Sequence, residues 1–300
     1  MDKFPHFADS GRVVVTGAGG RLGVAVVPYL EAYGWEVIAV DRVPPPIRAG
    51  GKFVTADLTD FGEVAELLVG FDESAPATAV VHLAAIPAPG LYTDAVTFAN
   101  NVPATYNVFR AAKLAGITNV VFASSETTLG LPFEIWPPYA PVDEEYTVLP
   151  QTTYALGKAC EEEMARHFTR WDPDLKIAGL RFSNVMHPED YARFPTWQDS
   201  PKTRRWNMWS YIDARDGAQA VRKALEADFT GFEAFVIANA DNAMSRDSAD
   251  LLAEEFPGIP LKRPVVGRES LLSIEKAKRV LGYAPEYSWR TESAAQVSGA

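Results

Sequence analysis

Short apolar runs alternate with longer segments of helical periodicity over the first 180 residues of the chain. The run Arg12–Thr16 is rich in β-branched residues and stops at a glycine-rich turn, which is typical of a buried strand. The next apolar residues fall at helical spacing, at Leu22, Val26, Val27 and Leu30. Because Gly34 then ends that segment and a second apolar run follows at 36–40, the opening predicts a strand–helix–strand unit.

The same alternation continues along the chain. It predicts further strands near residues 52–56, 79–83, 119–123 and 175–180, and helices near residues 61–68, 94–115 and 152–171. Because parallel strands must be joined by crossover connections, this order predicts an α/β fold with a doubly wound parallel sheet of the Rossmann type.

Beyond residue 180 the pattern is less regular. A polar, tryptophan-rich stretch at 186–209 is followed by a helix near 216–227, a strand at 234–238 and short amphipathic helices near 248–256 and 273–281. We expect residues 1–180, joined by later segments at about 210–240, to form the Rossmann domain. Residues 181–300 are then expected to form a small, partly helical C-terminal lobe.

The composition is that of an ordinary globular protein, with 47% hydrophobic and 22% charged residues. Lys and Arg number 28 against 39 Asp and Glu, and the net charge of −11 repels phosphate backbones and anionic lipid. No segment approaches the roughly 20 apolar residues of a membrane span, and the start of the chain does not resemble a secretory leader. We therefore expect neither nucleic acid nor a membrane as a partner.

Cys160 is the single cysteine of the chain. One cysteine excludes an intrachain disulfide framework and a cysteine-based metal site, and we expect no metal ion in the functional site. A reducing, cytoplasmic location fits this composition.

Gly17, Gly20 and Gly23 lie where the first predicted strand meets the first helix. Without side chains there, the backbone can approach a pyrophosphate at the positive helix N-terminus, next to Arg21 and Leu22. An acidic residue, Asp41, ends the second strand 18 residues after the last of these glycines, as a dinucleotide site requires. Together these features predict a dinucleotide cofactor rather than a purely structural glycine turn.

The residues that follow the second and third strands indicate which dinucleotide binds. A carboxylate at Asp41 can accept both hydroxyls of a ribose and repels a 2′-phosphate, which favours NAD over NADP. Arg42 beside it keeps NADP open as the less favoured cofactor. Asp57 and Leu58 are placed to border the adenine, although Asp57 could instead cap the following helix.

Tyr154 and Lys158 are four residues apart on a predicted helix, so their side chains share one face. A neighbouring ammonium lowers the pKa of a phenol toward the working range of a general base. An exposed i,i+4 pair has the same spacing, but Ser125 ends the fifth strand, at the edge of such a sheet where ligands bind. The three residues predict acid/base chemistry on a substrate oxygen, with Thr127 as a reserve hydroxyl.

Several ordered motifs carry a resemblance to a known family. They are Thr16–Gly23 (TGAGGRLG), Asp57–Leu58, His82–Ala85 (HLAA), Asn101–Val102, Phe122–Ser125 (FASS), Tyr154–Lys158 (YALGK) and Arg181–Val185 (RFSNV). In this order they resemble the extended short-chain dehydrogenase/reductases of the NAD-dependent epimerase/dehydratase family, over about residues 12–225.

The resemblance implies a role for each matching position. Ser125 would polarise the substrate oxygen, Tyr154 would be the acid/base, and Lys158 would lower the tyrosine pKa and bind the nicotinamide ribose. The other positions that the resemblance places at the cofactor are Leu83, Ala84, Ala85 and Asn101. We expect His82 to be structural, because a histidine at a strand end is commonly satisfied by nearby backbone.

Two positions depart from the family pattern. Glu126 stands where the family often has a small residue, and its carboxylate either binds a substrate hydroxyl or points outward. His187 follows the Asn-Val pair, in Met-His-Pro where the family commonly has Tyr-Gly-Pro, and is either a substrate contact or an ordinary loop histidine.

The length of one segment bears on the substrate. Family members that act on nucleotide sugars hold the nucleotide diphosphate in a long insertion, whereas only 27 residues separate Asn184 from Tyr211 here. This layout resembles the uronate dehydrogenase-like members and favours a small carbohydrate or sugar acid. Candidate contacts are Asn184, the faces of Trp197, Trp206 and Trp209, a carboxylate-binding pair from Arg204 and Arg205, and more weakly Arg193. An aromatic-rich lid or interface loop is the alternative.

Three functions follow from these residues. The leading hypothesis is an NAD-dependent oxidoreductase that oxidises a hydroxyl of a small carbohydrate or sugar acid. The second is a sugar or nucleotide-sugar epimerase or dehydratase that regenerates a tightly bound NAD. The third, from a different class, is a non-catalytic binding protein that senses NAD(H).

The helices at 94–115 and 152–171 carry apolar residues on more than one face. In the second helix the side chains placed away from Tyr154 are Cys160, Met164, His167, Phe168 and Trp171. Such helices need a further surface to bury against, and members of the family often dimerise through the matching pair. We expect a homodimer in which Cys160 is a buried small hydrophobic residue.

Overall fold

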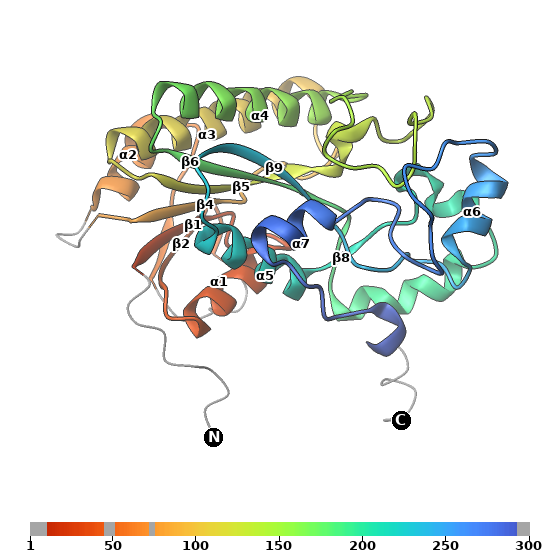
Figure 1. The fold of residues 1–300 in the computed structure, drawn as a ribbon. Helices are drawn as coiled ribbons and strands as arrows, with labels where there is room; N and C mark the ends of the chain where they lie inside the picture. Colours follow the sequence, from red (N-terminus) through yellow and green to blue (C-terminus); the bar gives the residue numbers. More distant parts are fainter. Residues whose placement is uncertain (1–10, 45–51, 72–75, 293–300) are drawn as a thin grey trace.

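The computed structural model describes residues 11–44, 52–71 and 76–292 (Figure 1). Within these ranges seven parallel strands form one sheet. The strands are β1 (Arg12–Thr16), β2 (Glu36–Asp41), β3 (Lys52–Thr55), β4 (Ala79–His82), β5 (Asn119–Ser125), β6 (Lys176–Phe182) and β9 (Gly231–Ile237). Their order across the sheet is β3-β2-β1-β4-β5-β6-β9. This is the doubly wound order that reverses between β1 and β4, so the prediction of a parallel Rossmann sheet is confirmed.

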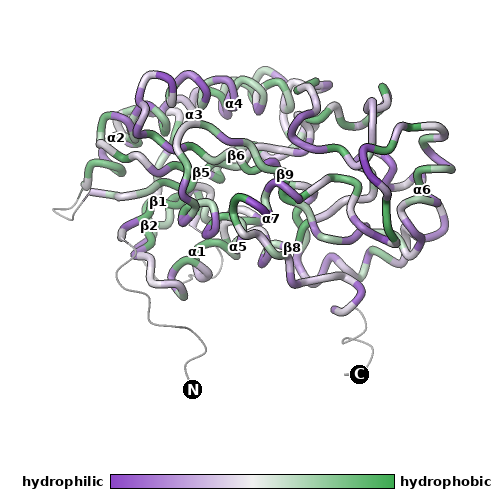
Figure 2. The backbone as a smooth tube through the Cα atoms, in the orientation of Figure 1, coloured by the Kyte–Doolittle hydropathy of each residue, from purple (hydrophilic) through white to green (hydrophobic). Residues whose placement is uncertain are grey.

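Helices cover both faces of the sheet (Figure 1). One face carries α2 (Phe61–Val69), α3 (Asp94–Leu114) and α4 (Thr153–Trp171), and the other carries α1 (Gly23–Ala32), α5 (Ala214–Glu226) and α7 (Glu275–Leu281). Val14 is buried under the first group, whereas Val13 and Val15 are buried under the second. Because successive residues of a strand point to opposite faces, a strand covered on both sides must be apolar throughout. Figure 2 shows hydrophobic residues along the strands and a mixture of hydrophobic and hydrophilic residues along the helices that cover them.

Local signals set where the helices begin. The Asp60 side chain accepts hydrogen bonds from the backbone N–H groups of Gly62 and Glu63 at the start of α2. The Thr152 hydroxyl accepts the N–H of Ala155 at the start of α4. These caps place Tyr154 in the first turn of α4, and the observed elements differ from the predicted ones mainly by a few residues at their ends.

A smaller lobe lies at one end of the sheet (Figure 1). It contains a short parallel pair, β7 (Val185–Met186) and β8 (Ile212–Asp213), the 3₁₀ helices η2 (Pro188–Trp197) and η3 (Pro201–Asn207), and α6 (Ser248–Glu255). Buried aromatic side chains form its core, including Tyr191, Phe194, Trp209 and Tyr211. The tryptophan-rich stretch thus folds into two 3₁₀ helices, which its irregular pattern did not predict. Within the described ranges no helix is both long and apolar enough to span a membrane.

A buried ion pair joins α4 to the centre of the sheet. Arg181 on β6 donates hydrogen bonds of 2.9 and 2.8 Å to the two carboxylate oxygens of Glu162, and the Ser124 hydroxyl donates to the same carboxylate at 2.6 Å. Both charged side chains are 2% exposed. Two buried charges compensate each other only while both are present, so the loss of one leaves the other desolvated and unpaired.

We expect Glu162→Ala to lower the free energy of unfolding by about 3–5 kcal/mol, because it leaves Arg181 buried without a counter-charge. Urea denaturation measures this change. Glu163→Ala is the matched control on the same helix, since Glu163 is 61% exposed and its pair with Arg166 lies on the surface. That substitution should change the free energy of unfolding by less than about 1 kcal/mol. Equal effects of the two substitutions would contradict the role of the buried pair.

Candidate active site

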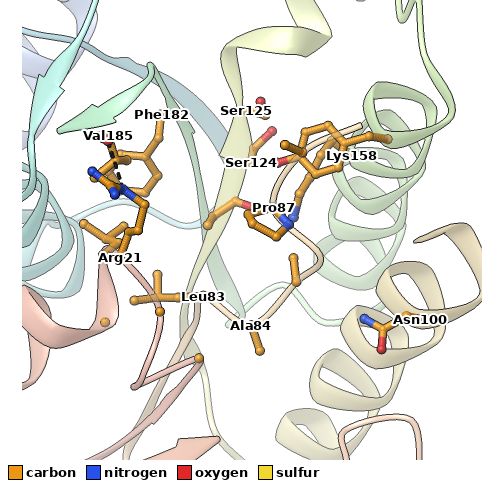
Figure 3. A pocket seen from close by; sticks show the side chains of 18 of the residues that line it. Arg21, Leu83, Ala84, Pro87, Asn100, Ser124, Ser125, Lys158, Phe182 and Val185 are labelled. Carbon is orange, nitrogen blue, oxygen red and sulfur yellow. Dashed lines mark hydrogen bonds between the residues drawn. The ribbon is translucent and has the colours of Figure 1, made fainter. Parts of the chain in front are cut away.

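The carboxyl ends of the strands open into one cavity of about 980 Å³ (Figure 3). Its lining comes from the glycine turn after β1, from the ends of β2, β4, β5 and β6, from the first turns of α4, and from Trp206 of η3. The volume lies at the upper end of the range for ligand cavities. The switch in strand order therefore places the glycine motif and the Ser-Tyr-Lys group on the walls of the same cavity.

The glycine turn has no room for side chains. A Cβ on Gly17, whose φ is +70°, would lie 2.5 Å from the backbone N of Ala84, and a Cβ on Gly23 would lie 2.1 Å from the carbonyl oxygen of Gly17. Gly20 and Gly19 line the cavity as bare backbone beside them. The turn is thus a cradle of peptide groups at the N-terminus of α1, where a pyrophosphate is stabilised. Gly19 was missed in the sequence although it lies within the motif.

Arg21 and Leu22 of the turn also line the cavity. The Arg21 side chain crosses to the smaller lobe, where it donates to the carbonyl oxygen of Val185 at 3.3 Å and to the carboxylate of Asp190 (Figure 3 shows the bond to Val185). The glycine turn and the start of the lobe are therefore tied together by one side chain.

Asp41 lies at the end of β2 with its carboxylate on the cavity wall. One oxygen accepts the backbone N–H of Gly19 at 2.9 Å and the other accepts the N–H of Arg42 at 2.7 Å. A carboxylate offers about four lone-pair sites, so these two bonds orient Asp41 and leave acceptors for ribose hydroxyls. The Arg42 side chain is exposed at the same rim.

Asp57 and Leu58 line the cavity beside this rim. Asp57 accepts hydrogen bonds from the backbone N–H and the hydroxyl of Thr59, and these bonds hold the pKa of its carboxyl below the usual value. The alternative reading of Asp57 as a helix cap is wrong, because Asp60 caps α2.

Ser125, Tyr154 and Lys158 are buried together on the cavity wall. The Ser125 oxygen accepts hydrogen bonds from the hydroxyl and the backbone N–H of Thr127, at 2.9 and 3.2 Å. A hydroxyl has two acceptor sites and one proton, and the proton of Ser125 is shared with the Tyr154 oxygen, since the hydrogen bond between them lowers the pKa of the phenol. Thr127, expected as a reserve hydroxyl, thus orients the serine.

The Lys158 ammonium lies 6.0 Å from the centre of the Tyr154 ring. It donates to the carbonyl oxygen of Ala123 at 2.8 Å and to the carboxylate of Glu161 at 2.9 Å. Burial lowers the pKa of Lys158, but the charge of Glu161 and the neighbouring Tyr154 outweigh that effect, so its pKa is raised and the ammonium is retained. Glu161 was missed in the sequence analysis, although it lies one helical turn after Lys158.

Burial is also the largest influence on the Tyr154 phenol and raises its pKa. The Lys158 ammonium and a hydrogen bond with Ser125 act in the opposite direction and favour the phenolate. The deprotonated form of Tyr154, which a general base at this position would require, therefore depends on the lysine beside it.

His82 and Asn101 lie behind the cavity wall rather than on it. His82 is buried between the hydroxyls of Thr16 and Thr105, at 2.8 and 3.1 Å, and burial lowers its pKa to about 3. It is a neutral structural residue as expected, with threonine hydroxyls instead of backbone as its partners. The Asn101 amide exchanges two hydrogen bonds with the backbone of Ile86.

The expected cofactor contact of Asn101 is therefore corrected to a positioning role. Its side chain fixes the loop that carries Leu83 and the small residues Ala84 and Ala85, which line the cavity. Asn100, the preceding residue, lines the cavity in place of Asn101 (Figure 3).

Arg204 and Arg205 do not form the expected carboxylate-binding pair. Arg204 is 7% exposed and donates to Asn184 Oδ1 at 2.9 Å and to the carbonyl oxygen of Ser210 at 3.0 Å. Arg205 faces the other way, toward Glu255 at 3.8 Å. The prediction was wrong because adjacent residues of a 3₁₀ helix point in different directions, which a sequence pair does not reveal.

Of the other predicted substrate contacts, some line the cavity and others do not. Asn184 and Trp206 line the cavity. Trp209 is fully buried in the lobe, where its indole N–H donates to the carbonyl oxygen of Pro201. The remaining candidates, His187, Trp197 and Arg193, also lie outside the cavity lining.

Glu126 is buried and lines the cavity. The alternative that its side chain points outward is therefore wrong. Its carboxylate accepts hydrogen bonds from the Ser183 hydroxyl at 2.6 Å and the Asn207 amide at 3.2 Å. Burial raises its pKa to about 7.

With this geometry in hand, comparisons with known proteins identify the class. Residues 13–238 match the NAD dependent epimerase/dehydratase family. The chain belongs to this family, whose members are NAD-dependent enzymes of the extended short-chain dehydrogenase/reductase type, and the resemblance read from the sequence is confirmed.

Individual relatives are distant. The chain is 26% identical over 292 residues to the NAD-dependent glucose-6-phosphate dehydrogenase of Haloferax volcanii, covering 91% of this chain and 92% of that protein. It is 26% identical over 191 residues to the uronate dehydrogenase of Pseudomonas putida, covering 62% and 66% of the two chains. A short-chain dehydrogenase/reductase superfamily protein from Agrobacterium tumefaciens with bound NAD shares the fold, with a TM-score of 0.71, 23% identity and coverage of 96% and 98%.

NAD is the cofactor of this family, and the residues present fit it. The bare peptide groups from Gly17 to Gly23 form a cradle for a pyrophosphate, and the Asp41 carboxylate keeps acceptors free for a ribose. Small side chains at Ala84 and Ala85 leave the centre of the cavity open.

We expect Asp41→Asn to weaken NAD binding about 10–100-fold, because hydrogen bonds to a charged acceptor contribute about 1.5–3 kcal/mol. Loss of the charge should also reduce the preference for NAD over NADP, because the carboxylate repels the 2′-phosphate of NADP. Calorimetric titration with both dinucleotides measures these affinities. Glu36→Gln, at the exposed other end of β2, is the control and should bind NAD normally. Unchanged NAD affinity in the Asp41 variant would exclude this carboxylate as the ribose ligand.

Proposed function

We propose that this protein is an NAD-dependent dehydrogenase that oxidises a hydroxyl group of a small carbohydrate. The observation that carries the proposal is the burial of Ser125, Tyr154 and Lys158 on the wall of the same cavity that the glycine turn lines. Family membership and the names of two relatives, a uronate dehydrogenase and a glucose-6-phosphate dehydrogenase, support it.

The side chains supply the proton chemistry of this reaction. Bound NAD supplies the hydride acceptor. Ser125 is oriented by Thr127 and shares a hydrogen bond with Tyr154, so a substrate hydroxyl that enters between the two would accept the Ser125 proton and lie next to the phenol. The Tyr154 phenolate removes the hydroxyl proton, and the Lys158 ammonium stabilises the phenolate while Ala123 and Glu161 hold it in place.

The segment from Asn184 to Tyr211 supports a small substrate. It folds as β7, η2 and η3 against the buried aromatic core of the lobe, and contributes Asn184 and Trp206 to the cavity wall. This segment is committed to packing, so it leaves little chain for a separate nucleotide pocket.

Tyr154→Phe should lower kcat by about 10²–10⁴-fold, because it removes the general base while preserving the ring. NADH formation across a panel of free sugars, sugar acids and polyols measures the rate, and calorimetry should show unchanged NAD affinity. Since burial raises the pKa of Tyr154, the wild-type rate should increase with pH as the phenolate forms. Tyr146→Phe, a buried tyrosine outside the cavity lining, is the control with normal activity.

The same experiment separates the other functions that these residues allow. A wild-type protein that binds NAD but turns over no compound would favour an NAD(H)-sensing role. The family also includes epimerases and dehydratases, which retain NAD and return product without net NADH. Mass spectrometry of the denatured protein detects retained cofactor and identifies that case.

We further propose a cytoplasmic setting for the enzyme. Cys160, the single cysteine, is half-buried in the protomer, and burial raises the pKa of its thiol. A thiol with a raised pKa is a poor nucleophile, which suits a reduced and unreactive cysteine.

We also propose a homodimer formed through α3 and α4. Large apolar side chains are exposed on both helices, at Val96, Tyr106, Leu114, Leu156 and Trp171. Phe168, expected on this outer face, is instead buried against Phe109 inside the protomer. The remaining apolar patch gives a second copy a surface to cover.

Light scattering at micromolar concentration should give the mass of a dimer for the wild type and of a monomer for Leu156→Arg, because an arginine would be desolvated without a partner at the interface. Leu261→Arg is a control at a similarly exposed leucine of the other lobe and should stay dimeric. A monomeric wild type would refute the proposed dimer.

A further inference from the structure

The substrate end of the cavity is defined here as the wall formed by Ser125, Glu126, Ser183, Asn184 and Trp206. It contains one carboxylate, Glu126, that the proton chemistry does not use. Glu126 directly follows Ser125 in the chain and is 3% exposed. A buried carboxylate one residue from the reacting group is placed to contact the substrate itself.

The contacts of Glu126 leave it able to accept more hydrogen bonds. One oxygen accepts from the Ser183 hydroxyl at 2.6 Å and the other accepts from the Asn207 amide at 3.2 Å. The backbone N–H of Asn184 is a third donor, all three donors are uncharged, and a carboxylate has about four acceptor sites. The protein therefore orients Glu126 without saturating it, and a substrate hydroxyl is the donor that would complete it.

The cations near this wall contact other groups of the protein, although the Nε of Arg204 is buried with no hydrogen-bond partner among the described residues. Lys158 pairs with Glu161 at 2.9 Å, and Arg21 pairs with Asp190. Arg204, which acts on Glu126 by its charge, lies behind the lining and donates to Asn184 and Ser210. Of the five residues that define this wall, Glu126 alone is charged, and Arg204 lies behind them, so an anionic substrate would meet a carboxylate before a cation.

We propose that Glu126 determines specificity by accepting a hydrogen bond from a substrate hydroxyl next to the reacting carbon, and that the substrate is an uncharged sugar or polyol. This inference rests on the proposed dehydrogenase function. A sugar acid or sugar phosphate would bring a second negative charge to a buried carboxylate, and like charges in a poorly solvated site repel strongly.

The ionisation of Glu126 makes this selection depend on pH. The groups that face it are Ser183 and Asn184 after β6, Asn207 and Arg204 from η3, and Tyr154 from α4. Burial raises the pKa of Glu126 to about 7, against the hydrogen bonds and the Arg204 charge. Glu126 is then ionised above pH 7 and increasingly neutral below it, so anions should be excluded most strongly at alkaline pH.

The test compares compounds that share a sugar ring and differ at C6, where a charged group replaces or modifies the hydroxymethyl group: glucose with glucuronate and glucose 6-phosphate, and galactose with galacturonate. At pH 8 the wild type should show at least about tenfold higher kcat/KM for a neutral sugar than for its charged counterparts, mainly through KM. The difference should shrink at pH 6. Calorimetry of the same compounds with the protein–NADH complex gives a second measurement that does not require turnover.

Glu126→Gln keeps the shape of the side chain and removes its charge. It should reduce the neutral-over-anion preference about tenfold and abolish its dependence on pH. The matched control is Glu255→Gln, which changes a buried carboxylate of the lobe that pairs with Arg205. This variant should keep the preference for neutral sugars and its dependence on pH. Circular dichroism checks that each variant is folded.

The outcomes separate this inference from the function on which it rests. A wild type that prefers a sugar acid or a sugar phosphate, or a Glu126→Gln variant with unchanged preference, overturns the role of Glu126 while leaving the dehydrogenase intact. Absence of NADH formation with every compound contradicts the dehydrogenase. In that case, tighter binding of the anions by calorimetry still overturns the role of Glu126, and tighter binding of the neutral sugars supports it.

Discussion

The close approach of two backbone segments determines where everything else in this molecule lies. Gly17 at the end of β1 contacts the backbone after β4 so closely that a methyl group would overlap Ala84. These are the neighbouring strands between which the sheet reverses its order. Their carboxyl ends diverge to helices on opposite faces, and the crevice between them is the cavity. A side chain at this contact would force the two halves of the sheet apart and remove the binding site with them.

Helix α4 divides its residues between chemistry and support. Tyr154 and Lys158 face the cavity, whereas the next turn places Glu161 against Lys158 and Glu162 against Arg181 of the sheet. The ammonium that stabilises the phenolate is thus held by one carboxylate, while the adjacent carboxylate anchors the helix to β6. Chemistry and anchoring share one rigid element, so the distance between base and sheet is fixed by helix geometry.

The sequence predicted the parts of the protein whose structure follows from local sequence patterns. Alternating apolar runs located the strands of the sheet, and the glycine spacing with Asp41 located the cofactor cradle, because both depend on local backbone geometry. The lobe was harder, since its 3₁₀ helices lack a strong period and are held by tertiary contacts. Arg205 and Trp209 therefore looked available for a ligand but pair with Glu255 and pack in the core. Glu161 was missed because an acidic residue after a lysine resembles any surface pair until burial is known.

The Arg21 side chain links the glycine turn to the lobe that borders the other end of the cavity. It leaves the glycine turn and bonds to Val185 and Asp190, at the start of the lobe that carries Asn184 and Trp206. One guanidinium therefore belongs to the glycine turn and contacts the segment that borders Asn184, so the position of that segment depends on the conformation of the turn.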